Sequence, residues 1–148
     1  MNTKTRSLLA TLVLAACVVL LVEKHSLFAA GPVAIALQVL AALLMLWARL
    51  TFGMRSFHAT ANPTSGGLVT SGPYRYWRHP IYASVLLFMW TGILAHGIPP
   101  TLLDLALGAL ATAMTIVRVL AEEELLRAAM PEYAEYASRT KRFIPFVL

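Results

Sequence analysis

Four long apolar runs follow one another along the chain, separated by shorter polar segments. They contain no basic residue and a single acidic one, Asp104, and they cover residues 7–22, 31–48, 81–95 and 101–117. Each run has 15 to 18 residues, so as a helix it is about 22 to 27 Å long, slightly less than the ~30 Å hydrocarbon core of a bilayer. The pattern predicts four transmembrane helices, each completed by apolar or long basic residues at its ends.

The composition supports a membrane protein. Hydrophobic residues make up 59% of the 148 positions and charged residues only 13%, against about 25% charged in ordinary soluble domains. Too little polar sequence remains to cover a water-soluble core. The predicted fold class is therefore all-α, a polytopic membrane protein of about four transmembrane helices that forms one domain over residues 1–148.

The charge and the cysteine content restrict the possible binding partners and the possible disulfide or metal sites. The net charge of +5 indicates contact with anionic lipids rather than with nucleic acid, because little chain outside the apolar runs is left to form a basic binding surface. The single cysteine excludes an internal disulfide and a multi-cysteine metal site. His25 and His96 have no second ligand nearby in the sequence, so no metal site is expected.

Basic residues also predict the orientation. With the N-terminus inside, eleven of the twelve Lys and Arg residues fall on the cytoplasmic side and only Lys24 falls outside. This asymmetry follows the positive-inside rule. It predicts a multi-pass protein of the plasma or inner membrane, with both termini and a helical segment over residues 118–148 in the cytoplasm. The start of the chain also fits a signal sequence cleaved and lipid-modified at Cys17, although the apolar run continues beyond that residue.

The connection between the second and third runs, residues 51–80, is much longer than a turn requires. Its first part, "ATANPTSGG" at residues 59–67, has the composition of a linker. Its second part, "LVTSGPYRYWRHP", alternates aromatic and basic residues and contains two prolines, so we expect it to be ordered. A functional role for this half of the connection is expected.

A possible anion site lies at the end of this segment. Pro80 suits the first turn of the third helix and pushes His79 into an extended conformation. Arg75, Arg78 and His79 then surround a helix N-terminus, which favours a carboxylate or phosphate. The alternative is a belt of basic and aromatic residues that contacts lipid headgroups.

Three adjacent carboxylates, Glu122, Glu123 and Glu124, follow the fourth run, whose helix is predicted to continue to about Met130. Successive helical residues are about 100° apart, so the three cannot all point into solvent and at least one should face the other helices. The alternative is an ion pair of Glu122 with Arg118, one turn earlier.

Polar and small residues inside the fourth run have structural interpretations. Thr101 and Asp104 follow two prolines and form the pattern of a helix cap, which we favour over a functional intramembrane carboxylate. Gly108 and Thr112 are small residues one turn apart and predict close helix packing.

Two polar blocks of the sequence together resemble a known family. "LVTSGPYRYWRHPIY", followed after two apolar runs by "EEELL", "EYAEY" and "KRFIPF", is similar to the integral-membrane methyltransferases that include isoprenylcysteine carboxyl methyltransferases and phospholipid N-methyltransferases. The similarity covers about residues 68–146. It departs from the family pattern at Pro131, where the family has glycine.

The resemblance implies S-adenosylmethionine bound at the cytoplasmic surface, and methyl transfer to a carboxyl or amine group of a lipid-like or isoprenoid-bearing acceptor. Carboxylates and aromatic faces suit the cationic groups of this cofactor, and arginine suits its carboxylate. The expected catalytic residues are Arg78, Glu122 and Glu123. The expected cofactor-binding residues are Tyr74, Arg75, His79, Pro80, Tyr82, Glu122 and Glu123.

Two other functions stay open from the sequence. One is an NADPH-dependent reductase of the membrane sterol type, which has a similar cytoplasmic site but fits the "EEELL" block less well. The other is a non-enzymatic membrane protein whose basic loop binds anionic lipid or a partner protein.

Overall fold

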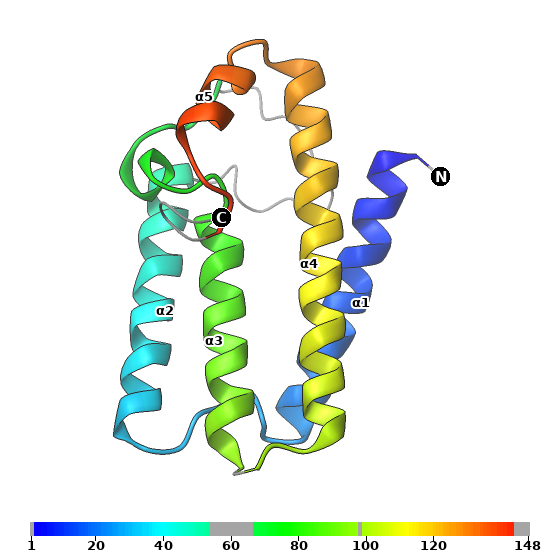
Figure 1. Ribbon diagram of the computed structural model, residues 1–148, viewed down its shortest axis with the longest axis vertical. Helices are drawn as coiled ribbons and strands as arrows, with labels where there is room; N and C mark the ends of the chain where they lie inside the picture. Colours follow the sequence, from blue (N-terminus) through cyan, green and yellow to red (C-terminus); the bar gives the residue numbers. More distant parts are fainter. Residues whose placement is uncertain (1, 54–66, 98, 144–148) are drawn as a thin grey trace.

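The computed structural model describes residues 2–53, 67–97 and 99–143. Four long helices run up and down, and a 3₁₀ turn and a short helix lie at one end of them (Figure 1). In chain order the elements are α1 (Thr3–Glu23), α2 (Pro32–Phe52), η2 (Gly72–Arg75), α3 (Pro80–His96), α4 (Leu102–Ala129) and α5 (Tyr133–Arg139). The described residues contain no named strand, so the predicted all-α class is confirmed.

Each of the four predicted apolar runs forms a helix. Three of these helices, α1 and α2 with 21 residues each and α4 with 28, are long and apolar enough to cross a membrane. The fourth, α3, has 17 residues, or about 25 Å. All four extend beyond the predicted runs, and α4 continues to Ala129, close to the predicted end at Met130. Residues 59–66 of the predicted linker lie outside the described residues.

The helices associate as two antiparallel pairs, with α1 along α4 and α2 along α3 (Figure 1). A core cluster, which includes Cys17 of α1, Met89 of α3 and Ala111 of α4, joins α1, α3 and α4. Many large apolar side chains point away from the protein instead, as expected for helices that face lipid. The composition of this outer surface is what makes the chain a membrane protein.

Small residues allow α3 and α4 to approach closely. A Cβ atom on Gly108 would lie 2.7 Å from Ile93 Cδ1, closer than side chains normally come. Four residues later, Thr112 Oγ1 accepts a hydrogen bond of 3.0 Å from Trp90 Nε1. The close packing predicted for Gly108 and Thr112 is therefore confirmed.

The end of the bundle away from the chain's N-terminus is closed by polar contacts. Thr101 caps α4 by accepting a hydrogen bond of 3.2 Å from the backbone N–H of Asp104, so the predicted cap is confirmed. The buried Asp104 carboxylate also lies 3.6 Å from Lys24 Nζ. Gln38 donates to the carbonyls of Leu27 and Phe88, which ties the α1–α2 connection to α3.

The opposite end collects the polar segments of the chain. The start of α1, the ends of α2 and α4, the first turn of α3, and α5 all lie at this end (Figure 1). An isolated parallel bridge between Trp77 and Lys141 joins the segment before α3 to the segment after α5. The two polar blocks of the sequence are therefore brought together, although Tyr82 at the end of the first is forty residues before Glu122 at the start of the second.

Candidate functional site

Pro80 begins α3 as predicted, but the prediction of an extended His79 is wrong. Pro80 occupies the first turn of α3 and is buried, and His79 precedes it with φ −128° and ψ 57°, outside the helical region. The backbone N–H groups of Arg78 and His79 do not face a free anion, because they donate to the carbonyls of Lys141 (2.7 Å) and Arg142 (3.1 Å). The backbone carbonyls of the segment after α5 therefore accept the hydrogen bonds of these two amides.

The three adjacent carboxylates on α4 point to three different partners. Glu122 reaches α3, Glu123 reaches the segment before α3 and the segment after α5, and Glu124 reaches α1, where Arg6 Nη2 lies 2.9 Å away. This divergence follows from the ~100° step between helical residues. The prediction that at least one of them faces the other helices is confirmed.

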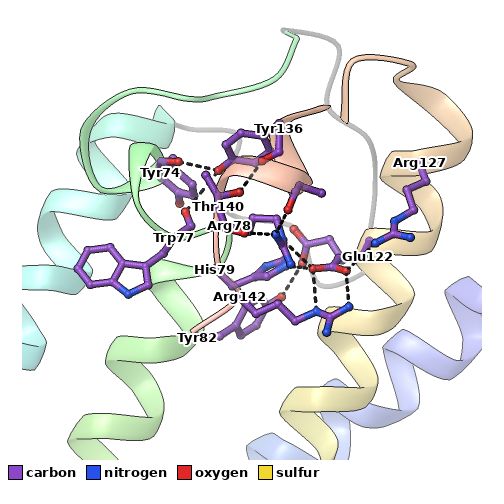
Figure 2. A network of polar contacts seen from close by, with 12 residues as sticks. Tyr74, Trp77, Arg78, His79, Tyr82, Glu122, Arg127, Tyr136, Thr140 and Arg142 are labelled. Carbon is purple, nitrogen blue, oxygen red and sulfur yellow. Dashed lines mark hydrogen bonds and ion pairs between the residues drawn. The ribbon is translucent and has the colours of Figure 1, made fainter. Parts of the chain in front are cut away.

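Glu123 is the centre of a buried ion cluster, part of which is drawn in Figure 2. Its carboxylate is 4% exposed and lies 3.0 Å from Arg78 Nε and 3.3 Å from His79 Nε2. Arg142 binds both of its oxygens, at 3.1 and 3.0 Å, and Arg127 approaches at 3.5 Å. A charge buried this deeply requires such partners, because burial alone would strongly disfavour it.

Arg78 connects this cluster to the chain end. Besides Glu123, its guanidinium donates to the backbone carbonyls of Ala137 (2.6 Å) and Thr140. Tyr136 secures the same region, since its hydroxyl donates to the carbonyl of Tyr74 at 2.7 Å. Burial raises the pKa of Tyr136 to about 12, so this hydroxyl remains a neutral donor at physiological pH.

Glu122 belongs to a second, more accessible chain of contacts. It is half-buried, and its Oε2 accepts a hydrogen bond of 2.9 Å from the hydroxyl of Tyr82. The same hydroxyl accepts one of 2.6 Å from Arg118 Nε, and Arg118 also donates to Thr11 of α1. The Tyr82 ring lies 5.7 Å from the His79 ring, so the two chains of contacts are neighbours.

The structure thus brings together most of the residues expected to form the site. Six of them lie where the start of α3 meets the end of α4. They are Arg78, His79, Pro80, Tyr82, Glu122 and Glu123. Tyr74 is buried beside them, where its ring packs against Phe52 at 5.3 Å. Arg75 lies in η2, and its side chain is exposed. Among the described residues, it does not contact Glu123.

Two site residues were not expected from the sequence. Arg142 is the bidentate partner of Glu123, and those hydrogen bonds raise the pKa of its guanidinium. Arg118 was considered only as an ion-pair partner of Glu122. The "KRFIPF" block contains Arg142 and was part of the resemblance, but a linear pattern does not show which of its two basic residues turns inward. Among the residues that the structure describes, no cluster of three or more His, Cys, Asp or Glu side chains could hold a metal ion.

Comparison of the sequence with known protein families identifies the family of this chain. The sequence model described as "Phospholipid methyltransferase" matches residues 26–132 of the chain. The chain belongs to this family. The match contains the Arg-His-Pro segment, helices α3 and α4, and Glu122 and Glu123, so Glu123 and its partners Arg78, His79 and Arg127 lie within the matched region. Arg142 lies beyond the matched residues.

Two curated relatives are similar over a shorter stretch. The cobalt-zinc-cadmium resistance protein CzcN of Cupriavidus metallidurans is 46% identical over 80 residues, which cover 53% of this chain and 35% of that protein. The nickel-cobalt-cadmium resistance protein NccN of Alcaligenes xylosoxydans xylosoxydans is 39% identical over 80 residues, which cover 36% of that protein. The matched stretch is thus about a third of either relative's length. No solved structure matches the chain.

Proposed function

We propose that this protein transfers a methyl group from S-adenosylmethionine to a lipid-like or isoprenoid-bearing acceptor, at the cytoplasmic face of a membrane. Family membership supports methyl transfer. The convergence of the Arg78–Tyr82 segment with Glu122 and Glu123 is the observation that carries the proposal, because it gathers charges of both signs next to aromatic rings. The positive-inside rule assigns this end of the bundle to the cytoplasm.

The chemistry of these side chains fits the cofactor. S-adenosylmethionine supplies an activated methyl group on a sulfonium, and it carries an ammonium and a carboxylate. Carboxylates and aromatic faces bind the cationic groups, while arginine binds the carboxylate. Methyl transfer is a displacement at carbon, so the protein acts mainly by holding the acceptor in line and excluding water.

The two glutamates have different roles in this proposal. Glu123 is saturated by Arg78, His79 and Arg142, so its charge serves to hold the segments before α3 and after α5 against α4. Glu122 is half-buried, and its carboxylate accepts a hydrogen bond from the hydroxyl of Tyr82. Glu122 is therefore the carboxylate that contacts the cofactor or acceptor, and Glu123 is a positioning residue.

The acceptor determines whether a base is needed. A carboxylate acceptor is already ionised at neutral pH, whereas an ammonium acceptor must first lose a proton. Glu122 is the accessible group for that proton, because His79 is buried and bound to Glu123. Activity that rises with pH only for amine acceptors would show that the acceptor must lose this proton.

The direct test is transfer of a labelled methyl group from S-adenosylmethionine to lipid extract by the purified protein in detergent. Glu122→Gln is expected to lower turnover at least 100-fold, the scale of a lost acid–base or charge contact. Glu124→Gln is the matched control, since Glu124 lies two residues later on the same helix but faces Arg6 of α1. Equal turnover in both variants would remove Glu122 from the mechanism.

Ligand-dependent thermal stability separates the remaining functions. S-adenosylmethionine should raise the melting temperature and NADPH should not, since only a ligand that binds the folded state stabilises it. Stabilisation by NADPH alone would favour the reductase, and stabilisation by neither would favour a protein that binds lipid or a partner without catalysis.

A further inference from the structure

Tyr133 has a buried hydroxyl without a hydrogen-bond partner among the described residues. It is the first residue of α5 and is 1% exposed, packed with Met130 and Tyr136. Buried hydroxyl groups almost always find a partner, and an unpaired one lowers stability. Phenylalanine would fill the same space without that cost, so packing alone gives no reason for the hydroxyl.

The neighbouring Tyr136 shows what a structural tyrosine looks like in this region. Its ring centroid is 6.0 Å from that of Tyr133, and both rings belong to the same cluster. The Tyr136 hydroxyl, however, donates to the carbonyl of Tyr74 and lies 3.3 Å from that of Trp77. These two tyrosines lie three residues apart on one short helix. The hydroxyl of Tyr136 is hydrogen-bonded within the folded protein, whereas that of Tyr133 has no partner among the described residues.

The surroundings of the Tyr133 hydroxyl are those of the proposed site. Burial raises its pKa, the negative charge of Glu123 raises it further, and the positive charge of Arg78 opposes this. The hydroxyl therefore remains protonated at neutral pH and can donate a hydrogen bond. Ala137 packs against the cluster of Tyr133, and its carbonyl accepts a hydrogen bond of 2.6 Å from Arg78, so Tyr133 lies beside the ion cluster. Arg78 and Arg142 both bind the carboxylate of Glu123 there, and the hydroxyl of Tyr133 adds an uncharged donor for a carboxylate oxygen.

We infer that Tyr133 is a cofactor-binding residue whose hydroxyl donates to the carboxylate at the amino-acid end of S-adenosylmethionine. This inference rests on the proposed function. It assigns to the "EYAEY" block a contact that the Arg-His-Pro segment and the glutamates do not supply. It also explains why a polar atom is kept unpaired in the free protein, since the ligand provides its partner.

The test compares Tyr133→Phe with Tyr136→Phe in detergent, with S-adenosylhomocysteine as the probe. Tyr133→Phe should weaken binding about tenfold, the loss expected for one hydrogen bond to a charged group, without lowering the melting temperature of the free protein. Tyr136→Phe should lower that melting temperature, because it removes a hydrogen bond already present. Methylthioadenosine lacks the amino-acid end, so its affinity should be the same for the wild type and Tyr133→Phe.

Each other outcome has a definite meaning. Unchanged affinity of Tyr133→Phe for S-adenosylhomocysteine, with the wild type binding normally, overturns the inference and leaves the proposed function intact. A melting temperature lowered as much as in Tyr136→Phe also overturns it, since the hydroxyl would then be bonded in the free protein. Failure of the wild type to bind the probe overturns the proposed function, and the inference with it.

Discussion

Glu123 and Glu124 are adjacent residues with opposite environments. Glu123 is 4% exposed and compensates Arg78, His79 and Arg142, whereas Glu124 is 57% exposed and pairs with Arg6 at the surface. Removing one partner of a buried ion cluster leaves uncompensated charge, while a surface pair contributes little. The same substitution should therefore have very different effects at the two positions.

Glu123→Gln is expected to destabilise the protein by about 3–5 kcal/mol, and Glu124→Gln by at most about 1 kcal/mol. Thermal unfolding in detergent, followed by circular dichroism, measures the difference. Glu123 binds Arg142 and so holds the segment after α5 in place. A protease should therefore cleave this segment, which begins at Thr140, faster in the Glu123→Gln variant. Equal stability of the two variants would mean that Glu123 does not hold these segments together.

At the scale of the elements, the bundle depends on positions where helices or loops approach without room for a side chain. A Cβ atom on Gly92 of α3 would lie 2.0 Å from the backbone carbonyl oxygen of Leu27, which belongs to the α1–α2 connection. A backbone atom cannot move aside as a flexible side chain can. The connection and α3 would have to separate, which would also strain the bonds from Gln38 to Leu27 and Phe88.

Gly92→Ala is therefore expected to lower the stability of the bundle by at least about 1–3 kcal/mol, the usual cost of overpacking. Gly97→Ala is the matched control five residues later, where the nearest atom to a Cβ is the Pro99 carbonyl oxygen at 3.9 Å. Melting temperatures in detergent should fall for the first variant and stay unchanged for the second. A neutral Gly92→Ala would show that the connection does not pack against α3 this closely.

At the scale of the whole molecule, the start of α3 and the end of α4, which carry the ion cluster, lie at one end of the bundle, and the capped start of α4 lies at the other (Figure 1). Ser138 of α5 and His96 at the end of α3 are both exposed and mark these two ends. The only native cysteine, Cys17, is 2% exposed and buried in the core, so it gives little background to thiol labelling.

The orientation predicted by the basic residues is tested with single cysteines at these positions. In intact cells, a membrane-impermeant maleimide should label His96→Cys, whereas Ser138→Cys should react only after lysis. The reverse pattern would place the cluster around Glu123 outside, where a cytoplasmic cofactor cannot reach it. Labelling is measured by the mass shift of the purified protein.

Much of the fold followed from the order of residues, because its signals are local. Apolar runs long enough to approach the bilayer thickness predicted the helices, Pro80 predicted where α3 begins, and Thr101 with Asp104 predicted how α4 is capped. The motifs also indicated the family, which the comparison with known proteins confirmed. The helices and their ends depend on residues within about one helical run of each other, whereas the family motifs are two blocks separated by two apolar runs.

Only the tertiary structure determined which charges meet. The sequence shows three adjacent glutamates, but their partners lie on α1, α3 and the segment after α5, and packing alone assigns one to each. It likewise turns Arg142 inward and leaves Arg75 exposed. Charge pairing in a buried site depends on distance and desolvation, which are set by the association of helices rather than by their order in the chain.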